Sequence, residues 1–356
     1  MDNHGSWDLD EDDIEPTGLP FQQPQIEWRE VEAFLPADAY PIFHPSDADV
    51  AHILALMDTT AVELELAPGE PVASASGNQF ADLRDGRVVK VGWRASELML
   101  EAYALVLVRA RTRVPVPRVH AAFVRDDAAH LVMDRVDGLP LHRAWASPGG
   151  GADRHAQLPR PALRAVLRQL QGAMDQLRAL GERLAAQAGG AARGRTAPMR
   201  PAFGSWPRQP YAHAAFVDER APAGLQAPSL VFASLAEFHA YWLARFGRHA
   251  ADPAYADLRA LWARSEGGSA ALPELMHGDL APRNVLVKDG AVVAILDWGT
   301  FGWYPTFWQM IGMWAQFKPK RVEDAIKEVF GGPSREASVY VELLALLDNP
   351  SFVEDE

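Results

Sequence analysis

The densest group of chemically capable side chains lies in the segment 276–305. Asp279 comes two residues after His277 and five residues before Asn284, and Asp297 follows the next short apolar run. Two carboxylates and an amide at the ends of a predicted β-hairpin form an oxygen-rich cluster, which suits Mg²⁺ because this hard cation prefers oxygen ligands. Asp279 could accept a proton from a hydroxyl group, while Asn284 and Asp297 could hold a metal that neutralises charge on a transferred phosphoryl group. The pattern therefore predicts phosphoryl transfer.

The same segment resembles a known pair of loops. The motif H-G-D-x-x-x-x-N from His277 to Asn284, followed by I-L-D-W, resembles the catalytic and metal loops of the aminoglycoside phosphotransferase and choline kinase-like family. That family is related to the protein kinases, whose loop reads H-R-D, and Gly278 in place of Arg favours its small-molecule branch. The resemblance covers about residues 60–320. It implies ATP and Mg²⁺ as cofactors, Asp279 as base or orienter, and a structural role for His277.

The resemblance also implies an α+β fold of the bilobal, protein-kinase-like type. Its N-lobe combines an antiparallel sheet with a helix, and its C-lobe is mainly helical and holds the catalytic β-hairpin. We expect three parts, namely an acidic N-terminal tail or extension (1–45), a nucleotide-binding N-lobe (46–139) and a catalytic, acceptor-binding C-lobe (140–356). The turn signal of Asp137-Gly-Leu-Pro140 marks the boundary between the lobes.

Lys90 fits the phosphate-binding lysine that the family carries on a first-lobe strand. It is the only lysine before Lys288 in a chain with five lysines and 29 arginines, and it lies between two valines. A compact ammonium group suits a phosphate pocket in which a guanidinium would be too bulky. The alternative is a lysine at a sheet edge whose amino group reaches solvent.

The acidic partner of Lys90 is expected on a predicted helix at 95–111. Glu97 and Glu101 lie one turn apart on the same face of that helix. The family pattern favours Glu101, because the segment around it precedes a Pro-Val-Pro segment at 115–117, and Glu97 is the fallback. The alternative is that both residues are solvated helix acids.

The loop 73–78 lies where kinases cover the nucleotide phosphates with small residues. Ser76 and Gly77 could offer a hydroxyl group and backbone N–H donors to phosphate oxygens. The segment 130–138 resembles the linker between the lobes, whose backbone would meet the nucleotide base. The alternatives are an ordinary turn for the loop and a plain core strand for the linker. The linker residues assigned to the nucleotide are Met133, Asp134 and Val136.

The elements that must position these residues follow from turn signals and apolar spacing. Two β-patterned pairs of runs flank Asp85-Gly86 and Asp289-Gly290, and each pair predicts a hairpin. Apolar residues at spacings of three and four predict a long helix from about Pro161. A Gly-, Ala- and Arg-rich stretch at 185–204 is expected to be a loop. The other predicted elements are strands at 119–124 and 130–135, and helices at 95–111, 235–246, 253–264 and from about 306 onward.

Composition excludes several classes of function. The absence of cysteine excludes a disulfide scaffold and thiolate chemistry. No apolar run approaches the ~18 residues of a membrane span, and the N-terminus lacks the features of a secretory signal. The basic residues are too diffuse for a nucleic-acid surface. We therefore expect a cytoplasmic protein, a monomer or weak homodimer, with a small-molecule acceptor and neither a membrane nor a nucleic acid as partner.

The net charge of −13 is concentrated at the chain ends, since residues 1–15 hold seven acidic residues and no basic one. The segment 140–200, where we expect the acceptor, has ten arginines against three acids. This predicts that the acceptor of the γ-phosphoryl group of ATP is an alcohol other than a polycationic aminoglycoside. The alternative is a catalytically altered or inactive kinase-like protein that binds nucleotide or acts as a scaffold. Gly299, where many relatives carry Glu, leaves that alternative and the number of metal ions open.

Overall fold

A computed structural model describes residues 31–60, 62–63, 65–67, 70–71, 78–145, 158–190, 201–211, 214–216, 231–266, 272–317 and 320–347. These residues form two compact units. The first unit contains the described residues within 31–33, 37–99 and 119–135, and the second those within 34–36, 100–118 and 136–347. Ser76 and Gly77 lie outside the described residues, as does most of the predicted acidic extension. The division at residues 45 and 139 stays a prediction.

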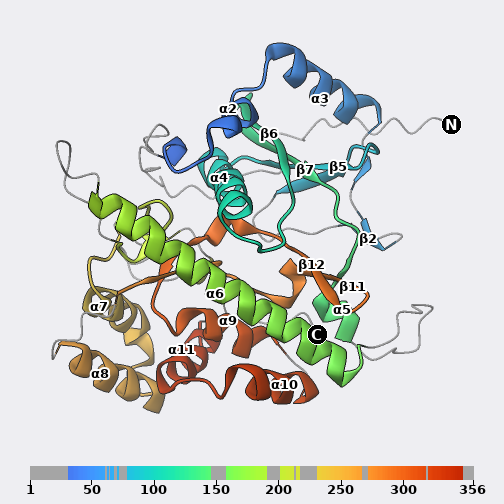
Figure 1. The fold of residues 1–356 in the computed structure, drawn as a ribbon. Coiled ribbons are helices and arrows are strands. Elements are labelled where there is room, and N and C mark those ends of the chain that lie inside the picture. The colour runs from blue at the N-terminus through green and yellow to red at the C-terminus, as the bar shows by residue number, and fades with distance from the viewer. Residues whose placement is uncertain are drawn as a thin grey trace. The chain divides into compact units, whose positions relative to one another are not determined.

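The first unit is built on a five-stranded antiparallel sheet with the strand order β1-β4-β5-β7-β6 (Figure 1). Backbone pairing of Ala81 with Val89 and of Asp82 with Val88 confirms the hairpin predicted at Asp85-Gly86. The elements are η1 (Ala37–Ala39), α2 (Tyr40–Phe43), α3 (Asp47–Thr59), β1 (Val62–Glu63), β4 (Gln79–Asp82), β5 (Arg87–Gly92), β6 (Val119–Arg125) and β7 (Ala128–Asp134), with a separate pair β2 (Glu65–Ala67) and β3 (Glu70–Pro71).

Helix α3 supplies the apolar cover for one face of this sheet. Ser46 and Asp49 form a capping box at its start, which satisfies backbone N–H groups that have no partner within the helix. Ile53 of α3 packs in one buried cluster with Val89 of β5 and Val132 of β7. Because side chains alternate along a strand, Lys90 faces the opposite side of the sheet from Val89. The sheet pattern thus directs the lysine away from the α3 core.

Helix α4 (Ala95–Arg111) has the bounds that the sequence predicts, and it contributes residues 95–99 to the first unit and 100–111 to the second. The other elements of the second unit are β8 (Leu139–Pro140), α5 (Leu141–Trp145), α6 (Arg160–Gly190), β9 (Gly204–Ser205), η2 (Ala214–Phe216), α7 (Leu235–Arg245), η3 (Phe246–His249), α8 (Pro253–Glu266), β10 (Glu274–Met276), η4 (Pro282–Asn284), β11 (Val285–Lys288), β12 (Ala291–Ile295), η5 (Trp298–Thr300), β13 (Gly302–Tyr304), α9 (Trp308–Gln316), α10 (Lys320–Phe330) and α11 (Arg335–Ala345).

The long helix α6, yellow-green in Figure 1, organises the second unit. It packs against α10, β10 and β12, and its leucines at 163, 167, 170, 177 and 184 are buried as the spacing predicts. The predicted second hairpin is confirmed, since β11 pairs with β12. The loop expected from residue 185 is wrong for residues 185–190, which continue α6. Three alanines and a glutamine in that stretch are good helix formers, which favours continuation of the helix.

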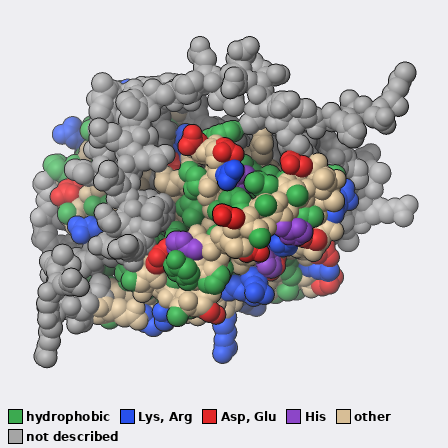
Figure 2. All heavy atoms as spheres, turned by 90° about the horizontal axis from the view of Figure 1, so that it is seen from above, with side chains coloured by type: hydrophobic (Ala, Val, Ile, Leu, Met, Phe, Trp, Pro, Cys, Tyr) green, Lys and Arg blue, Asp and Glu red, His purple; other side chains and the backbone are tan. Residues whose placement is uncertain are grey.

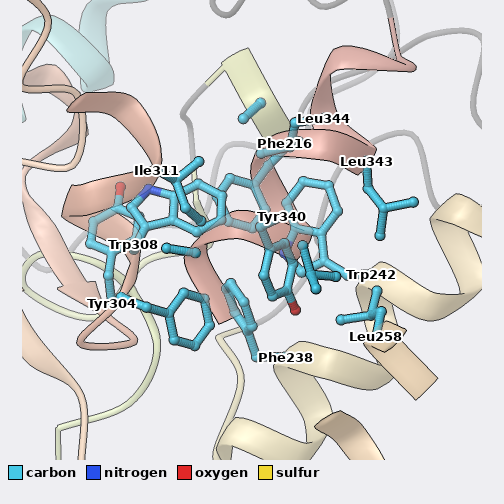
Figure 3. Close-up of a cluster of buried hydrophobic side chains, with 14 of the residues drawn as sticks. Phe216, Phe238, Trp242, Leu258, Tyr304, Trp308, Ile311, Tyr340, Leu343 and Leu344 are labelled. Carbon is cyan, nitrogen blue, oxygen red and sulfur yellow. The ribbon is translucent and has the colours of Figure 1, made fainter. Parts of the chain in front are cut away.

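Aromatic side chains dominate the core between the helices of the second unit. Figure 3 shows Phe238, Trp242, Trp308 and Tyr340 in one cluster, to which α7, α9 and α11 contribute. The rings of Trp242 and Trp308 stack at 5.9 Å, and those of Phe238 and Trp308 meet edge to face at 5.7 Å. Large buried rings of this kind contribute most of the apolar burial in a core, and the same cluster includes Met276 of β10 and Tyr304 of β13.

Charged side chains of both signs lie on the face of the molecule drawn in Figure 2. They are interspersed there with hydrophobic side chains. Within the ranges described above, no helix has the length and apolar character that a membrane span needs. Several arginines of the segment 140–200 are neutralised by acids from elsewhere in the second unit. Arg160 and Arg164 pair with Glu328, and Arg178 pairs with Glu274.

Candidate active site

The loop 277–284 connects β10 to β11 and carries the H-G-D motif. Gly278 has a φ of +90°, and a Cβ built there would lie 2.4 Å from the Thr300 carbonyl oxygen and 2.7 Å from the Tyr304 hydroxyl oxygen. An L side chain at this position is therefore both strained and blocked. The arginine that protein kinases carry at this place of the motif does not fit this loop.

His277 joins the loop to the chain segment that follows β12. Its Nε2–H donates to the Leu296 carbonyl oxygen (2.9 Å), and its Nδ1 accepts from the Asp279 backbone N–H (3.3 Å). These bonds need a neutral ring, and burial lowers the pKa of His277, although the nearby Asp279 carboxylate acts in the opposite direction. The ring also meets Trp298 edge to face, 4.7 Å between centroids. This arrangement supports the structural role expected for His277.

Three side chains orient the Asp279 carboxylate, which is 10% exposed. Its Oδ2 accepts from Arg283 Nη2 (2.7 Å) and from Asn284 Nδ2 (3.4 Å), and its Oδ1 accepts from Gln316 Nε2 (3.4 Å). Asn284 Nδ2 also donates to the Asp279 carbonyl oxygen at 3.0 Å. The structure thus brings Asp279 and Asn284 together, and the carboxylate has a defined orientation.

Asn284 and Asp297 lie at the base of the β11–β12 hairpin. The Leu296 N–H donates to the Asn284 carbonyl oxygen at 2.8 Å, so the end of the loop and the residue before Asp297 are adjacent. Asp297 is exposed and has a left-handed backbone with a φ of 61°. The hairpin therefore delivers an amide and an exposed carboxylate from its two ends, as the sequence pattern predicts.

The chemistry of these side chains fits Mg²⁺. Over the described part of the chain, no group of three or more His, Cys, Asp or Glu could hold a metal ion. A metal bound by Asn284 and Asp297 would take its other ligands from phosphate oxygens and water, which is how Mg²⁺ is commonly held. The amide nitrogen of Asn284 is directed to Asp279, so its amide oxygen lies on the other side of the group. The role of Asn284 and Asp297 as metal ligands stays a prediction.

Glu101 lies against the backbone that follows Asp297. It is 3% exposed, and a Cβ built on Gly299 would lie 3.7 Å from its Oε2. The alternative that Glu101 is a solvated acid is therefore wrong. A glutamate at position 299 would bring a second carboxylate beside that of Glu101. Gly299 avoids this repulsion between like charges.

Lys90 lies in the central strand β5, between β4 and β7, and is 3% exposed. The alternative of a sheet-edge lysine that reaches solvent is therefore wrong. Its Nζ lies 5.5 Å from the ring centroid of Phe80, which is opposite Lys90 in the pairing of β4 with β5. At this distance the ring face attracts the ammonium group. Lys90 belongs to the first unit and Glu101 to the second, so their ion pair stays a prediction.

The fallback residue Glu97 has a different environment from Glu101. Its side chain is 30% exposed, and its Oε1 lies 3.6 Å from Arg94 Nη1. Burial raises the pKa of Glu97, while Arg94 and, to a smaller extent, Lys90 act in the opposite direction. Glu97 thus has an arginine as its nearest ion-pair partner, and Glu101 is the more deeply buried of the two acids.

The predicted linker residues lie at the end of β7 and beyond it. Met133 is buried and pairs with both neighbouring strands, β5 and β6. Asp134 Oδ1 lies 2.7 Å from His120 Nε2, and the Arg135 N–H donates to a carbonyl oxygen of the β4–β5 turn. Val136 is half-buried and belongs to the second unit. The assignment of these residues to the nucleotide stays a prediction.

Two residues that contact Asp279 were not among the predicted site residues. Arg283 lies four residues after Asp279 in the same loop, so this short separation could have pointed to their contact. Gln316, the last residue of α9, lies 37 residues after Asp279. No local pattern relates these two positions, because only the packing of α9 brings Gln316 to the loop.

The sequence matches a model of the phosphotransferase enzyme family over residues 83–333. No curated protein matches it. Among solved structures, the GDP complex of wild-type aminoglycoside 2'-phosphotransferase-IIIa is 16% identical, with a TM-score of 0.51 over 84% of this chain and 88% of that chain. The GDP and kanamycin complex of APH(2")-IIia is 15% identical, with a TM-score of 0.50 over 83% of this chain and 89% of that chain. This likeness in fold confirms the predicted α+β, protein-kinase-like fold class.

Proposed function

The chain belongs to the phosphotransferase enzyme family, and we propose on this basis that it transfers the γ-phosphoryl group of ATP to a hydroxyl group of a small molecule, with Mg²⁺. The observation that carries the proposal is the hydrogen-bonded loop 277–284, in which His277 and Asn284 hold Asp279. Both solved structures contain GDP, and one also contains kanamycin. A nucleotide and a small alcohol are therefore the ligands to test first.

The proposed reaction begins with an acceptor hydroxyl beside Asp279. The hydroxyl oxygen forms a bond to the γ-phosphorus while the bond from that phosphorus to the β–γ bridging oxygen breaks, so that ADP leaves. Asp279 orients the hydroxyl and takes its proton. We assign this task to Oδ1, because its one described hydrogen bond, from Gln316, is long at 3.4 Å.

Other residues position the phosphates in this proposal. Lys90, paired with Glu101, holds the α- and β-phosphate oxygens, and its buried position on β5 supports a role beyond solubility. Asn284 and Asp297 would hold Mg²⁺, which supplies positive charge against the phosphate oxygens when it is bound. His277 acts through Asp279 as a positioning residue and transfers no proton, because its low pKa and its two hydrogen bonds keep it neutral.

Asp279→Asn tests the proposed phosphotransferase activity against the alternative of a protein that only binds nucleotide or acts as a scaffold. We expect turnover to fall by about 10²–10⁴-fold, since the amide cannot accept the proton, while the affinity for ADP·Mg²⁺ changes less than threefold. ADP release with a panel of alcohols and calorimetric ADP binding measure the two effects. The matched control is Asp257→Asn, which changes an exposed carboxylate bonded to Arg335. An Asp279→Asn enzyme with normal turnover would exclude Asp279 as the base.

Lys90→Ala tests the nucleotide site separately. Removal of the ammonium group should lower kcat/KM for ATP by about 10²-fold or more, because a charge-assisted phosphate contact is lost. Lys320→Ala, at an exposed lysine of α10, is the matched control. If the wild-type protein binds no ATP·Mg²⁺ and the Lys90→Ala variant gives the same result, the proposed phosphotransferase function is wrong.

A further inference from the structure

Arg283, Gln316 and Asp279 form a closed ring of hydrogen bonds. Arg283 Nη2 donates to Asp279 Oδ2 (2.7 Å), Arg283 Nη1 donates to Gln316 Oε1 (2.6 Å), and Gln316 Nε2 donates to Asp279 Oδ1 (3.4 Å). All three residues belong to the second unit. A positive charge is therefore held next to the carboxylate at which the acceptor hydroxyl is proposed to bind.

The elements around Arg283 hold its backbone and leave its head group accessible. Arg283 lies in η4, where its neighbours Pro282 and Asn284 are buried, while its own side chain is 47% exposed. Gln316 ends α9, whose preceding turns are packed in the aromatic core. The guanidinium is thus braced by a rigid helix on one side, and its outer edge faces solvent.

The hydrogen-bonding capacity of Arg283 exceeds what the ring uses. A guanidinium has five N–H donors in a planar fork, and the ring uses two of them. The remaining donors lie beside Asp279 and can bind a carboxylate or phosphate group through a charge-assisted pair. Helix α5, which packs against η4, adds His142 and Arg143 to the same region of the second unit.

The positive charge of Arg283 beside Asp279 also affects which kind of acceptor can bind there. An acceptor with a positive charge near its reacting hydroxyl would place that charge next to the Arg283 guanidinium when the hydroxyl binds Asp279. Two like charges at this distance repel each other, which is unfavourable. The segment 140–200 is weaker evidence on this point, because ion pairs with Glu274 and Glu328 neutralise part of its charge. Arg283 lies at the reacting carboxylate itself and is the stronger evidence.

We propose that Arg283, braced by Gln316, is the residue that selects the acceptor, and that the acceptor is a hydroxy acid whose anionic group binds the outer edge of the guanidinium while its hydroxyl binds Asp279. This inference rests on the proposed phosphotransferase function and specifies its substrate class. Gln316 is a positioning residue in this arrangement, since it acts through Arg283.

Matched pairs of probes test the proposal on the full chain. The pairs are D-glycerate with glycerol, pantothenate with pantothenol and 4-hydroxybutyrate with 1,4-butanediol, and calorimetry measures their binding in the presence of ADP·Mg²⁺. We expect at least one acid to bind ten or more times more tightly than its neutral counterpart. Arg283→Gln should weaken binding of that acid at least tenfold and change binding of the neutral partner less than threefold.

Further variants separate charge, geometry and folding. Arg283→Lys keeps the charge without the fork and should recover part of the affinity, whereas Gln316→Ala should weaken acid binding three- to fivefold by freeing the guanidinium. The matched control is Arg335→Gln, which removes an exposed arginine of α11 and should bind the acids as the wild type does. Thermal unfolding checks that all variants fold.

The outcomes distinguish this inference from the proposed function. If the wild type binds ADP·Mg²⁺ but no acid binds more tightly than its neutral partner, or if Arg283→Gln weakens both partners equally, the selection of acids by Arg283 is wrong while the phosphotransferase proposal stands. If the wild type binds no nucleotide, the proposed function is wrong, and this inference is wrong with it. Tighter binding of an acid that depends on Arg283 supports the inference.

Discussion

Two glycines with almost the same positive φ precede the predicted lysine and the predicted catalytic aspartate. Gly86 has a φ of +89° in the turn before Lys90, and Gly278 has a φ of +90° directly before Asp279. Around Gly86, a built Cβ meets nothing within 4 Å, whereas the Cβ at Gly278 would lie 2.4 Å from the Thr300 carbonyl oxygen. A glycine with this φ thus has open space around it in the first unit and is enclosed by neighbouring atoms in the second.

The difference shows that the two residues are held in place by different means. Lys90 is positioned by backbone pairing of β5 with strands on both sides, so the turn can change without moving it. Asp279 is positioned by side-chain contacts from His277, Arg283 and Asn284. A loop held in this way should be sensitive to changes that a paired strand tolerates.

Gly278→Ala should have the largest effect on stability. The positive φ and the overlap with the Thr300 carbonyl oxygen should together lower the free energy of unfolding by about 4 kcal/mol. Urea unfolding followed by tryptophan fluorescence measures this, because eight of the nine described tryptophans belong to the second unit. Gly86→Ala is the matched control and should cost about 1 kcal/mol, from the backbone conformation alone. Equal costs at the two positions would contradict the comparison.

Acid should destabilise the second unit through His239. This ring is buried and its Nδ1 lies 2.7 Å from the Tyr340 hydroxyl. Burial lowers its pKa from 6.5 to about 4, although Glu336 acts in the opposite direction. The unfolded chain therefore binds the proton more tightly than the folded chain. As far as His239 is concerned, the free energy of unfolding is highest above about pH 6.5 and falls by about 3 kcal/mol as the pH drops to 4.

A variant isolates this effect from other titrating groups. His239→Gln removes the titration, so its free energy of unfolding should vary less with pH between 6.5 and 4 than that of the wild type. Urea unfolding at a series of pH values gives both curves. Parallel curves for the two proteins would show that His239 is not responsible for the acid sensitivity.

His277→Phe should have a smaller effect on stability and a specific effect on catalysis. Loss of the hydrogen bonds to Leu296 and Asp279 should lower the free energy of unfolding by about 2 kcal/mol. In the proposed reaction kcat should fall about tenfold, because Asp279 loses its orientation, while KM for ATP stays within twofold. His239→Phe, at a buried histidine of α7 whose Nδ1 lies 2.7 Å from the Tyr340 hydroxyl, is the control and should leave kcat unchanged. An unchanged kcat in His277→Phe would refute the positioning role.

Much of the fold follows from local patterns in the sequence. The bounds of α4, the two hairpins at Asp-Gly turns and the leucine stripe of α6 were predictable, because each depends on residues within one or two turns. The residues 185–190 were misassigned, since a Gly-rich composition competes there with good helix formers. The ends of such elements depend on packing that composition does not show.

The candidate site also has features that could be predicted from the sequence and features that only the structure shows. The order and spacing of His277, Asp279, Asn284 and Asp297 could be read from the sequence, because one loop and one hairpin bring these residues together. The burial of Glu101 became evident only in the structure, since burial depends on neighbours that are distant in the chain.

What the sequence alone determined is the set of groups available for phosphoryl transfer, because short spacings within one loop and hairpin set which side chains are neighbours. Only the tertiary structure decided how Asp279 is oriented and what lies beside it. Gln316 reaches the loop from the end of α9, 37 residues away, and with Asp279 it fixes the Arg283 guanidinium. Long-range packing therefore places the charge that we propose selects the acceptor.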